Sequence, residues 1–213
     1  MLRSFDFIGN IRSVCLKNIP LLAKLSLSHR EYYVAAGKCN IAKFFESFSA
    51  LEHLHLNDVS FAAGAGEVPT RLSYDLYCVK HLCISNIYLS DLNEVSCALF
   101  LIKSFPNLQS VEIKVECDDN DIPALESLEV EHFSDVTFNH LKEVKLIQTN
   151  GTIPEMQLML AKSPALMRML IEPCLVEDSA TVKILAKLTK FQRASPKAEV
   201  EYKLDKDPNL GPV

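Results

Sequence analysis

The chain has 213 residues, a formal net charge of −5 and a hydrophobic fraction of 48%. This length is sufficient for one domain or a short solenoid with a sizeable core. The acidic balance lacks the basic footprint of nucleic-acid-binding proteins, and no apolar run reaches the roughly 18 residues of a membrane span. The first residues also lack the basic cluster and apolar block of a secretory signal. We therefore expect an intracellular protein of the nucleus or cytoplasm that binds neither nucleic acid nor membrane.

The cysteines indicate a reducing compartment and no structural metal. Their number is odd, their spacing is irregular and no C-x-x-C occurs, which argues against a disulfide framework or a thiolate zinc site. We interpret them as reduced residues that act mostly as small core side chains, and we expect no cofactor. The seven cysteines are Cys15, Cys39, Cys78, Cys83, Cys97, Cys117 and Cys174.

A six-residue pattern recurs along the chain. In Leu51–Leu56 the apolar residues occupy positions one, four and six, so Leu54 and Leu56 point to one side of a strand and His53 and His55 to the other. The pattern begins at residues 2, 22, 51, 79, 108, 141 and 166, with spacings of 20, 29, 28, 29, 33 and 25. Leucine-rich repeats recur every 20–29 residues or so. The spacing predicts parallel strands of a leucine-rich-repeat solenoid, and residues 198–202 predict a final strand.

Two further alternating segments, residues 11–16 and 125–130, lie too close to their neighbours to be parallel strands, because a parallel crossover needs about a dozen residues. Residues 71–76 alternate strictly, and we interpret all three segments as short back strands on the convex side. Apolar residues at helical spacing predict crossover helices over residues 41–48, 92–105 and 154–162. An amphipathic helix with Val182, Leu185 and Leu188 is predicted over residues 179–191. The fold class is therefore α/β, with parallel concave strands and helices and back strands on the convex side.

The final third resembles the FBD domain of plant F-box/FBD/LRR-repeat proteins. The residues that carry this resemblance are Leu141–Val144, Asn150-Gly151, Pro154-Glu155, Leu160–Pro164 and Arg193–Glu199. The preceding hexamers resemble the repeat region of the same family. The resemblance implies a leucine-rich-repeat region at residues 1–132 and an FBD-like α/β cap at residues 133–203, and we expect residues 204–213 to form a disordered tail. It also implies the substrate-recognition part of an F-box ubiquitin-ligase receptor, which would bind a protein substrate of unknown identity.

Two departures from the family bear on this interpretation. The family usually begins with an F-box that docks on a Skp-type adaptor, and no residues here match it. The chain is already inside a repeat at Leu2, whereas terminal repeats normally need a polar cap, so we interpret it as a truncated product or a fragment. We expect a Skp-type adaptor to bind only if an F-box lies upstream, and a relic without independent function is the alternative. The helix at Glu155–Ala161 is also about a turn shorter than in the family.

Parallel stacking would place positions three and five of every hexamer in two rows on the concave face, on strands about 4.8 Å apart. Position three gives the row Ser4, Lys24, His53, His81, Ser110, Glu143 and Arg168. Position five gives the row Asp6, Ser26, His55, Cys83, Glu112, Lys145 and Leu170. An extended concave face suits protein recognition. The candidate partner-binding residues are Lys24, Ser26, His53, His55, His81, Cys83, Ser110, Glu112, Glu143 and Lys145.

The same rows suggest three other uses. His53, His55, His81 and Cys83 would form a square whose side chains suit zinc. Cys83 could act as a nucleophile with His55 or His81 as base and Glu112 as orienting group. The adjacent pairs Glu143–Arg168 and Glu112–Lys145 could simply neutralise each other. We expect neither metal binding nor catalysis, because Cys83 lies in mid-strand and the chain lacks the fingerprints of common enzyme classes.

Overall fold

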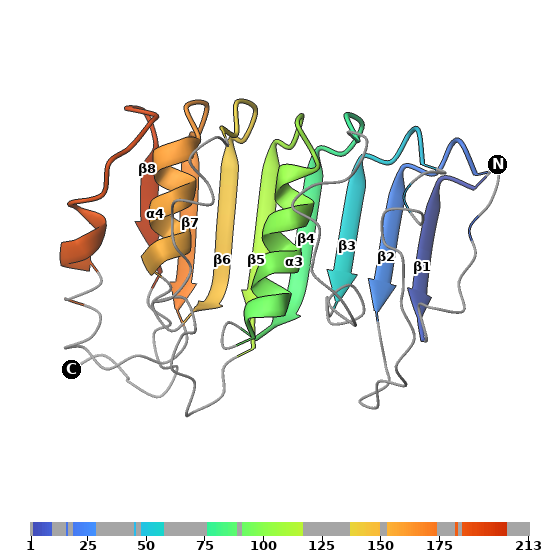
Figure 1. Cartoon of the computed structure of the whole chain (residues 1–213), viewed down its shortest axis with the longest axis horizontal. Helices are drawn as coiled ribbons and strands as arrows, with labels where there is room; N and C mark the ends of the chain where they lie inside the picture. Colours follow the sequence, from blue (N-terminus) through green and yellow to red (C-terminus); the bar gives the residue numbers. More distant parts are fainter. Residues whose placement is uncertain are drawn as a thin grey trace, which may run out of the picture.

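A computed structural model of the chain describes residues 2–9, 16, 19–28, 45, 48–57, 76–88, 91–116, 137–149, 153–173, 182 and 185–203. Within these residues, one parallel sheet contains eight strands in the order of the sequence (Figure 1). The strands are β1 (Ser4–Ile8), β2 (Lys24–Ser28), β3 (His53–Asn57), β4 (His81–Ile87), β5 (Ser110–Val115), β6 (Glu143–Thr149), β7 (Arg168–Pro173) and β8 (Glu199–Tyr202). Each of the seven hexamers supplies one strand, and the predicted final strand is β8. The arrangement is compatible with the predicted solenoid.

The strands pair in the predicted register. His53 of β3 lies opposite Lys24 of β2 and His81 of β4, so residues at hexamer position three follow one another across the sheet. Position five behaves in the same way, with His55 opposite both Ser26 and Cys83. A shift by one residue would exchange the buried and exposed faces of a strand, so the apolar pattern is sufficient to fix this register.

Two helices, α3 (Leu92–Lys103) and α4 (Ile153–Lys162), lie on one face of the sheet (Figure 1). They confirm the helices predicted over residues 92–105 and 154–162. The first turn of α3 carries Glu94 and the last turn Lys103, which suits the helix dipole. Among the described residues, neither helix is long and apolar enough to cross a bilayer.

The core lies between the sheet and the helices. Leu51, Leu54 and Leu56 are at most 1% exposed, so positions one, four and six of this hexamer are all buried. The rings of Phe45 and Phe105 meet edge to face, with centroids 6.2 Å apart. Side chains from the segments between strands therefore complete the core that the hexamers begin, as the amphipathic pattern predicts.

Strand β4 contains an irregularity that the sequence analysis did not predict. Its register with β5 shifts between Ile84 and Ile87, and Asn86 has a left-handed backbone with φ of 56°. Both isoleucines are buried, at 0% and 1% exposure. A strict alternation would place only one of two residues three positions apart in the core. The extra residue therefore lets β4 bury both Ile84 and Ile87.

The helix predicted over residues 179–191 needs a correction. The described part is helical at residue 182 and over residues 185–188, and Leu188 is buried. Val182 and Leu185 are 65% and 40% exposed, so Leu188 alone of the three predicted apolar residues is buried in the core.

Several predictions fall wholly or mainly outside the described residues. The back strands at residues 11–16, 71–76 and 125–130 are described only at Leu16 and Leu76, and the helix over residues 41–48 only at Phe45 and Phe48. The boundary between residues 132 and 133 and the tail at residues 204–213 also lie outside.

Candidate functional site

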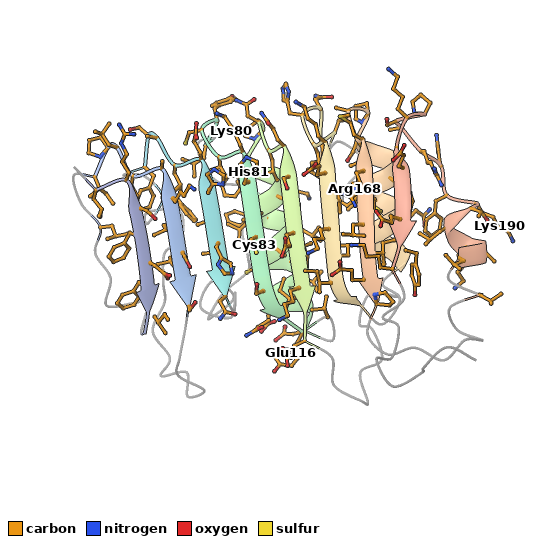
Figure 2. The ribbon with its side chains drawn as sticks, turned by 180° about the vertical axis from the view of Figure 1, so that it is seen from behind. Lys80, His81, Cys83, Glu116, Arg168 and Lys190 are labelled. Atoms are coloured by element: carbon orange, nitrogen blue, oxygen red, sulfur yellow. The ribbon has the colours of Figure 1, made fainter. Side chains whose placement is uncertain are left out.

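The face of the sheet opposite α3 and α4, here called the open face, carries the side chains of hexamer positions three and five (Figure 2). Among the described residues, no helix covers it. His81 and Cys83 of β4 and Arg168 of β7 all project from this face. It corresponds to the face that the sequence analysis predicts to be concave.

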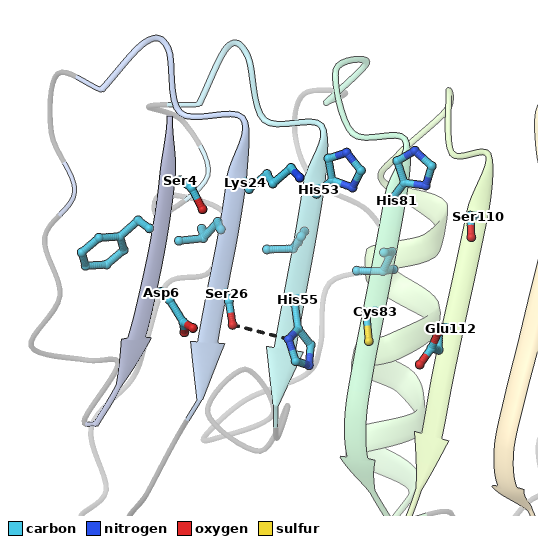
Figure 3. Close-up of a pocket in the computed structure, with 14 residues that line it drawn as sticks. Ser4, Asp6, Lys24, Ser26, His53, His55, His81, Cys83, Ser110 and Glu112 are labelled. Atoms are coloured by element: carbon cyan, nitrogen blue, oxygen red, sulfur yellow. Dashed lines mark hydrogen bonds between the residues drawn. The ribbon is translucent and has the colours of Figure 1, made fainter. Parts of the chain in front are cut away.

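A hollow of about 410 Å³ lies on the open face above β1–β5. Eight of the ten predicted candidate residues line it, and we call it the histidine hollow (Figure 3). These eight are Lys24, Ser26, His53, His55, His81, Cys83, Ser110 and Glu112. The other two candidates, Glu143 and Lys145, are on β6 and outside the lining. Ser4 and Asp6 complete its polar lining at β1.

The position-three row contains a stacked pair of imidazoles. The rings of His53 and His81 are nearly parallel, at 6°, with centroids 4.3 Å apart. Burial lowers the pKa of His53 below its ordinary value, and the neighbouring His81 and Lys24 lower it further. A pKa below 6.5 favours the neutral ring at pH 7. This part of the hollow therefore combines a lysine, Lys24, with a stacked imidazole pair in which His53 favours the neutral form at pH 7.

The position-five row is organised around His55. Its Nδ1 lies 3.4 Å from Oγ of Ser26 (Figure 3). Its Nε2 lies 3.3 Å from Oγ of Ser85. The two serine hydroxyls thus engage both ring nitrogens. Ser85 also lies 3.9 Å from Sγ of Cys83, a long contact even for sulfur. Ser26, His55 and Ser85 therefore form a hydrogen-bonded chain across β2, β3 and β4.

Cys83 lacks the features of an activated nucleophile. Burial raises the pKa of its thiol, and Glu112 raises it further, so the thiolate is disfavoured. Its hydrogen-bond contact is with Ser85, and the nitrogens of His55 are engaged by Ser26 and Ser85. The geometry therefore gives no support to the nucleophile hypothesis.

The four residues of the predicted zinc square do lie on adjacent strands in register. Their donor atoms do not converge, because His53 and His81 stack face to face while His55 points to serines. In the part of the chain that the structure describes, no three His, Cys, Asp or Glu side chains form a group that could hold a metal ion. The zinc hypothesis thus has no geometric support there.

The half of the open face above β6–β8 carries paired charges. Arg168 contacts Glu201 at 2.6 Å, and Glu172 contacts Lys145 at 3.9 Å and Lys203 at 3.6 Å. The predicted neighbours Glu143–Arg168 and Glu112–Lys145 are in register. The ion pairs shown are nevertheless different, because Arg168 and Lys145 turn towards the strand that follows their own. The two halves of the open face therefore differ in character.

Three residues of this region were not predicted from the sequence. Ser85 lies one residue beyond the hexamer at residues 79–84, and the continued alternation after Ile84 was a signal for it. Glu52 and Lys80 occupy position two of consecutive hexamers and form an ion pair at 2.7 Å beside the hollow. Their equal positions in neighbouring repeats were the available signal, since equal positions lie side by side in register.

The comparison with known proteins agrees with the sequence pattern. The chain is similar to an F-box/FBD/LRR-repeat protein of Arabidopsis thaliana. The two are 25% identical over 211 residues, which cover 92% of this chain and 50% of the relative. The chain therefore spans about half the length of the curated relative that it matches. No protein-family model matches the chain, and no solved structure matches it significantly.

Proposed function

We propose that this chain is a protein-recognition module whose partner docks in the histidine hollow. The observation that carries the proposal is the hollow itself, which collects eight polar candidates from four neighbouring strands, β2–β5, on the face opposite the helices. Solenoids commonly bind partners on such a face, since a rigid sheet presents side chains at fixed spacing over a long surface. The resemblance to an F-box/FBD/LRR-repeat protein supports the same role.

Within this proposal, the chain acts as the substrate-recognition part of an F-box-type ubiquitin-ligase receptor. Residues 1–132 would form the leucine-rich repeats and residues 133–203 the FBD-like cap, to which β6, α4, β7 and β8 would belong. The substrate is an intracellular protein. A Skp-type adaptor would bind an F-box and not the open face, so the two contacts are separable.

The ten candidate residues divide into two roles. The eight that line the hollow contact the partner directly. Glu143 and Lys145, on β6, contact it at the rim, where solvent screens charges and each contact adds little affinity.

An added bulky side chain in the hollow tests this proposal. Cys83 is half-buried on the open face, so Cys83→Trp should fill the hollow without adding charge or entering the core. Lys190→Glu is the control, because Lys190 is exposed and lies beyond the sheet (Figure 2). Proteins are captured from native extract by the wild-type chain, and the dissociation constant of each purified partner is measured for all three chains.

We expect Cys83→Trp to weaken binding of the partner by about tenfold or more, since a blocked central contact typically costs over 1 kcal/mol or so. Lys190→Glu should leave the dissociation constant unchanged. Circular dichroism checks that both variants retain the wild-type fold. Equal affinities for the folded Cys83→Trp variant and the wild type would refute docking in the hollow.

A further inference from the structure

We propose that the group held in the histidine hollow is a carboxylate of an acidic segment of the partner protein, anchored by Lys24, His53 and His81. This inference rests on the proposed function and specifies the partner chemistry. The three residues occupy the same row on adjacent strands, with Lys24 in register with His53 and His53 in register with His81. Neighbouring strands lie about 4.8 Å apart, so one carboxylate above His53 is within reach of both flanking side chains.

The local charges favour an anion at this row. Lys80, the other cation next to it, is already paired with Glu52 at 2.7 Å. Lys24 is exposed, and within the described residues it forms no ion pair. A partner carboxylate would therefore meet a cation that has no described counter-charge.

The neighbouring row disfavours an anion with more than one charge. At its centre, Ser26 and Ser85 each lie within hydrogen-bond distance of a ring nitrogen of His55. Its ends carry the carboxylates of Asp6 and Glu112, which also line the hollow. Like charges repel more strongly near a protein surface than in bulk water, so a dianionic phosphate is disfavoured relative to a single carboxylate. Among the described residues no arginine lines the hollow, so the lining lacks the planar fork that commonly recognises phosphate.

Binding at this row is linked to protonation of His53. The titratable and charged groups around His53 are Lys24 on β2, His81 on β4, Lys80 just before β4 and Glu52, the residue before His53. Burial, His81 and Lys24 lower the pKa of His53, and an added carboxylate opposes this effect. The pKa therefore rises on binding and the complex takes up protons. Affinity should increase as pH falls, by at most about tenfold per pH unit for each proton taken up.

A fluorescein-labelled hexaglutamate peptide is a direct probe, with hexaglutamine as the uncharged control. The net charge of −5 disfavours non-specific attraction of a polyanion, so binding would report a local site. Fluorescence anisotropy at low ionic strength, at about pH 7.5 and about pH 6, measures the affinity on both sides of the histidine range. We expect hexaglutamate to bind at least about threefold more tightly at the lower pH, and hexaglutamine to bind at neither.

Substitutions locate the effect. Lys24→Gln and His53→Gln should each remove most of the hexaglutamate binding, while Lys190→Gln, on an exposed lysine beyond the sheet, should not. Because Lys24 is exposed, Lys24→Gln should not disturb folding. This variant therefore tests the site even if His53→Gln perturbs the fold. The inference is overturned if hexaglutamate binds no better than hexaglutamine, if Lys24→Gln has no effect, if affinity does not rise at low pH, or if only a phosphoserine peptide binds.

The natural partner separates this inference from the proposed function. If Cys83→Trp abolishes partner binding but Lys24→Gln and pH leave it unchanged, the carboxylate inference fails and the docking proposal stands. If Cys83→Trp has no effect, the docking proposal fails, whatever the peptide does.

Discussion

The stacked rings of His53 and His81 are a direct result of the repeat register at the scale of single residues. Equal positions in consecutive parallel strands lie side by side, which brings the two imidazoles to a centroid separation of 4.3 Å. The sequence predicts this proximity, because the hexamer fixes both the register and the exposed face. It does not predict the stacked orientation or the two serine contacts of His55, since those depend on side-chain rotamers.

Cys97 of α3 gives a prediction at the same scale. Its side chain is 1% exposed, and burial, assisted by Glu94 and Asp91, raises the pKa of the thiol from 9.0 to about 12. Above pH 9 the unfolded chain therefore releases a proton that the folded chain keeps, so the folded state loses stability as pH rises. Below pH 9 this contribution is fully present and does not change with pH.

We expect the unfolding free energy of the wild type to fall more steeply above pH 9 than that of Cys97→Ala, by up to about 1.4 kcal/mol per pH unit. Urea denaturation at several pH values from neutral upwards measures both curves. The comparison cancels the titration of tyrosines and lysines, which both chains share. Parallel curves would contradict the account of the buried thiol.

At the scale of elements, the regular strands were predictable and the irregular one was not. The strand positions and their pairing follow from where apolar residues recur, because only one register buries them all. The bulge in β4 depends on one residue, Asn86, whose left-handed backbone has a weak sequence signature. The ion pairs that form differ from those suggested by the sequence, since the long side chains of Lys145 and Arg168 each have acidic neighbours on both sides.

Asn86 therefore provides the prediction at this scale. Asn86→Gly should change the stability of the folded chain little, because glycine adopts φ of 56° without steric cost. Asn86→Val should lower the unfolding free energy by about 1–2 kcal/mol, since a branched side chain clashes in the left-handed region. Urea denaturation of the pair measures the difference. Equal stability of the Gly and Val variants would show that the backbone at this position is not left-handed in solution.

At the scale of the whole molecule, the open face has two unlike halves on one continuous sheet. Above β1–β5 a hollow collects histidines, serines and one exposed lysine, and above β6–β8 the charges pair with each other. The sequence predicts which residues share the face. The sequence does not predict the position of the hollow. This position depends on the rotamers of the long charged side chains on β6–β8, which turn towards one another.

A direct test of docking on the open face is site-specific photo-crosslinking of the full chain. Benzoylphenylalanine is placed at Glu143, an exposed residue of β6 that lies in register with Ser110 next to the histidine hollow, or at Gln157, an exposed residue of α4 on the opposite face. The partner that binds the wild-type chain is added, and the crosslinked fraction is measured by mass spectrometry. We expect crosslinks from position 143 that free wild-type chain competes away, and none from position 157. Crosslinks from position 157 alone would show that recognition does not use the open face.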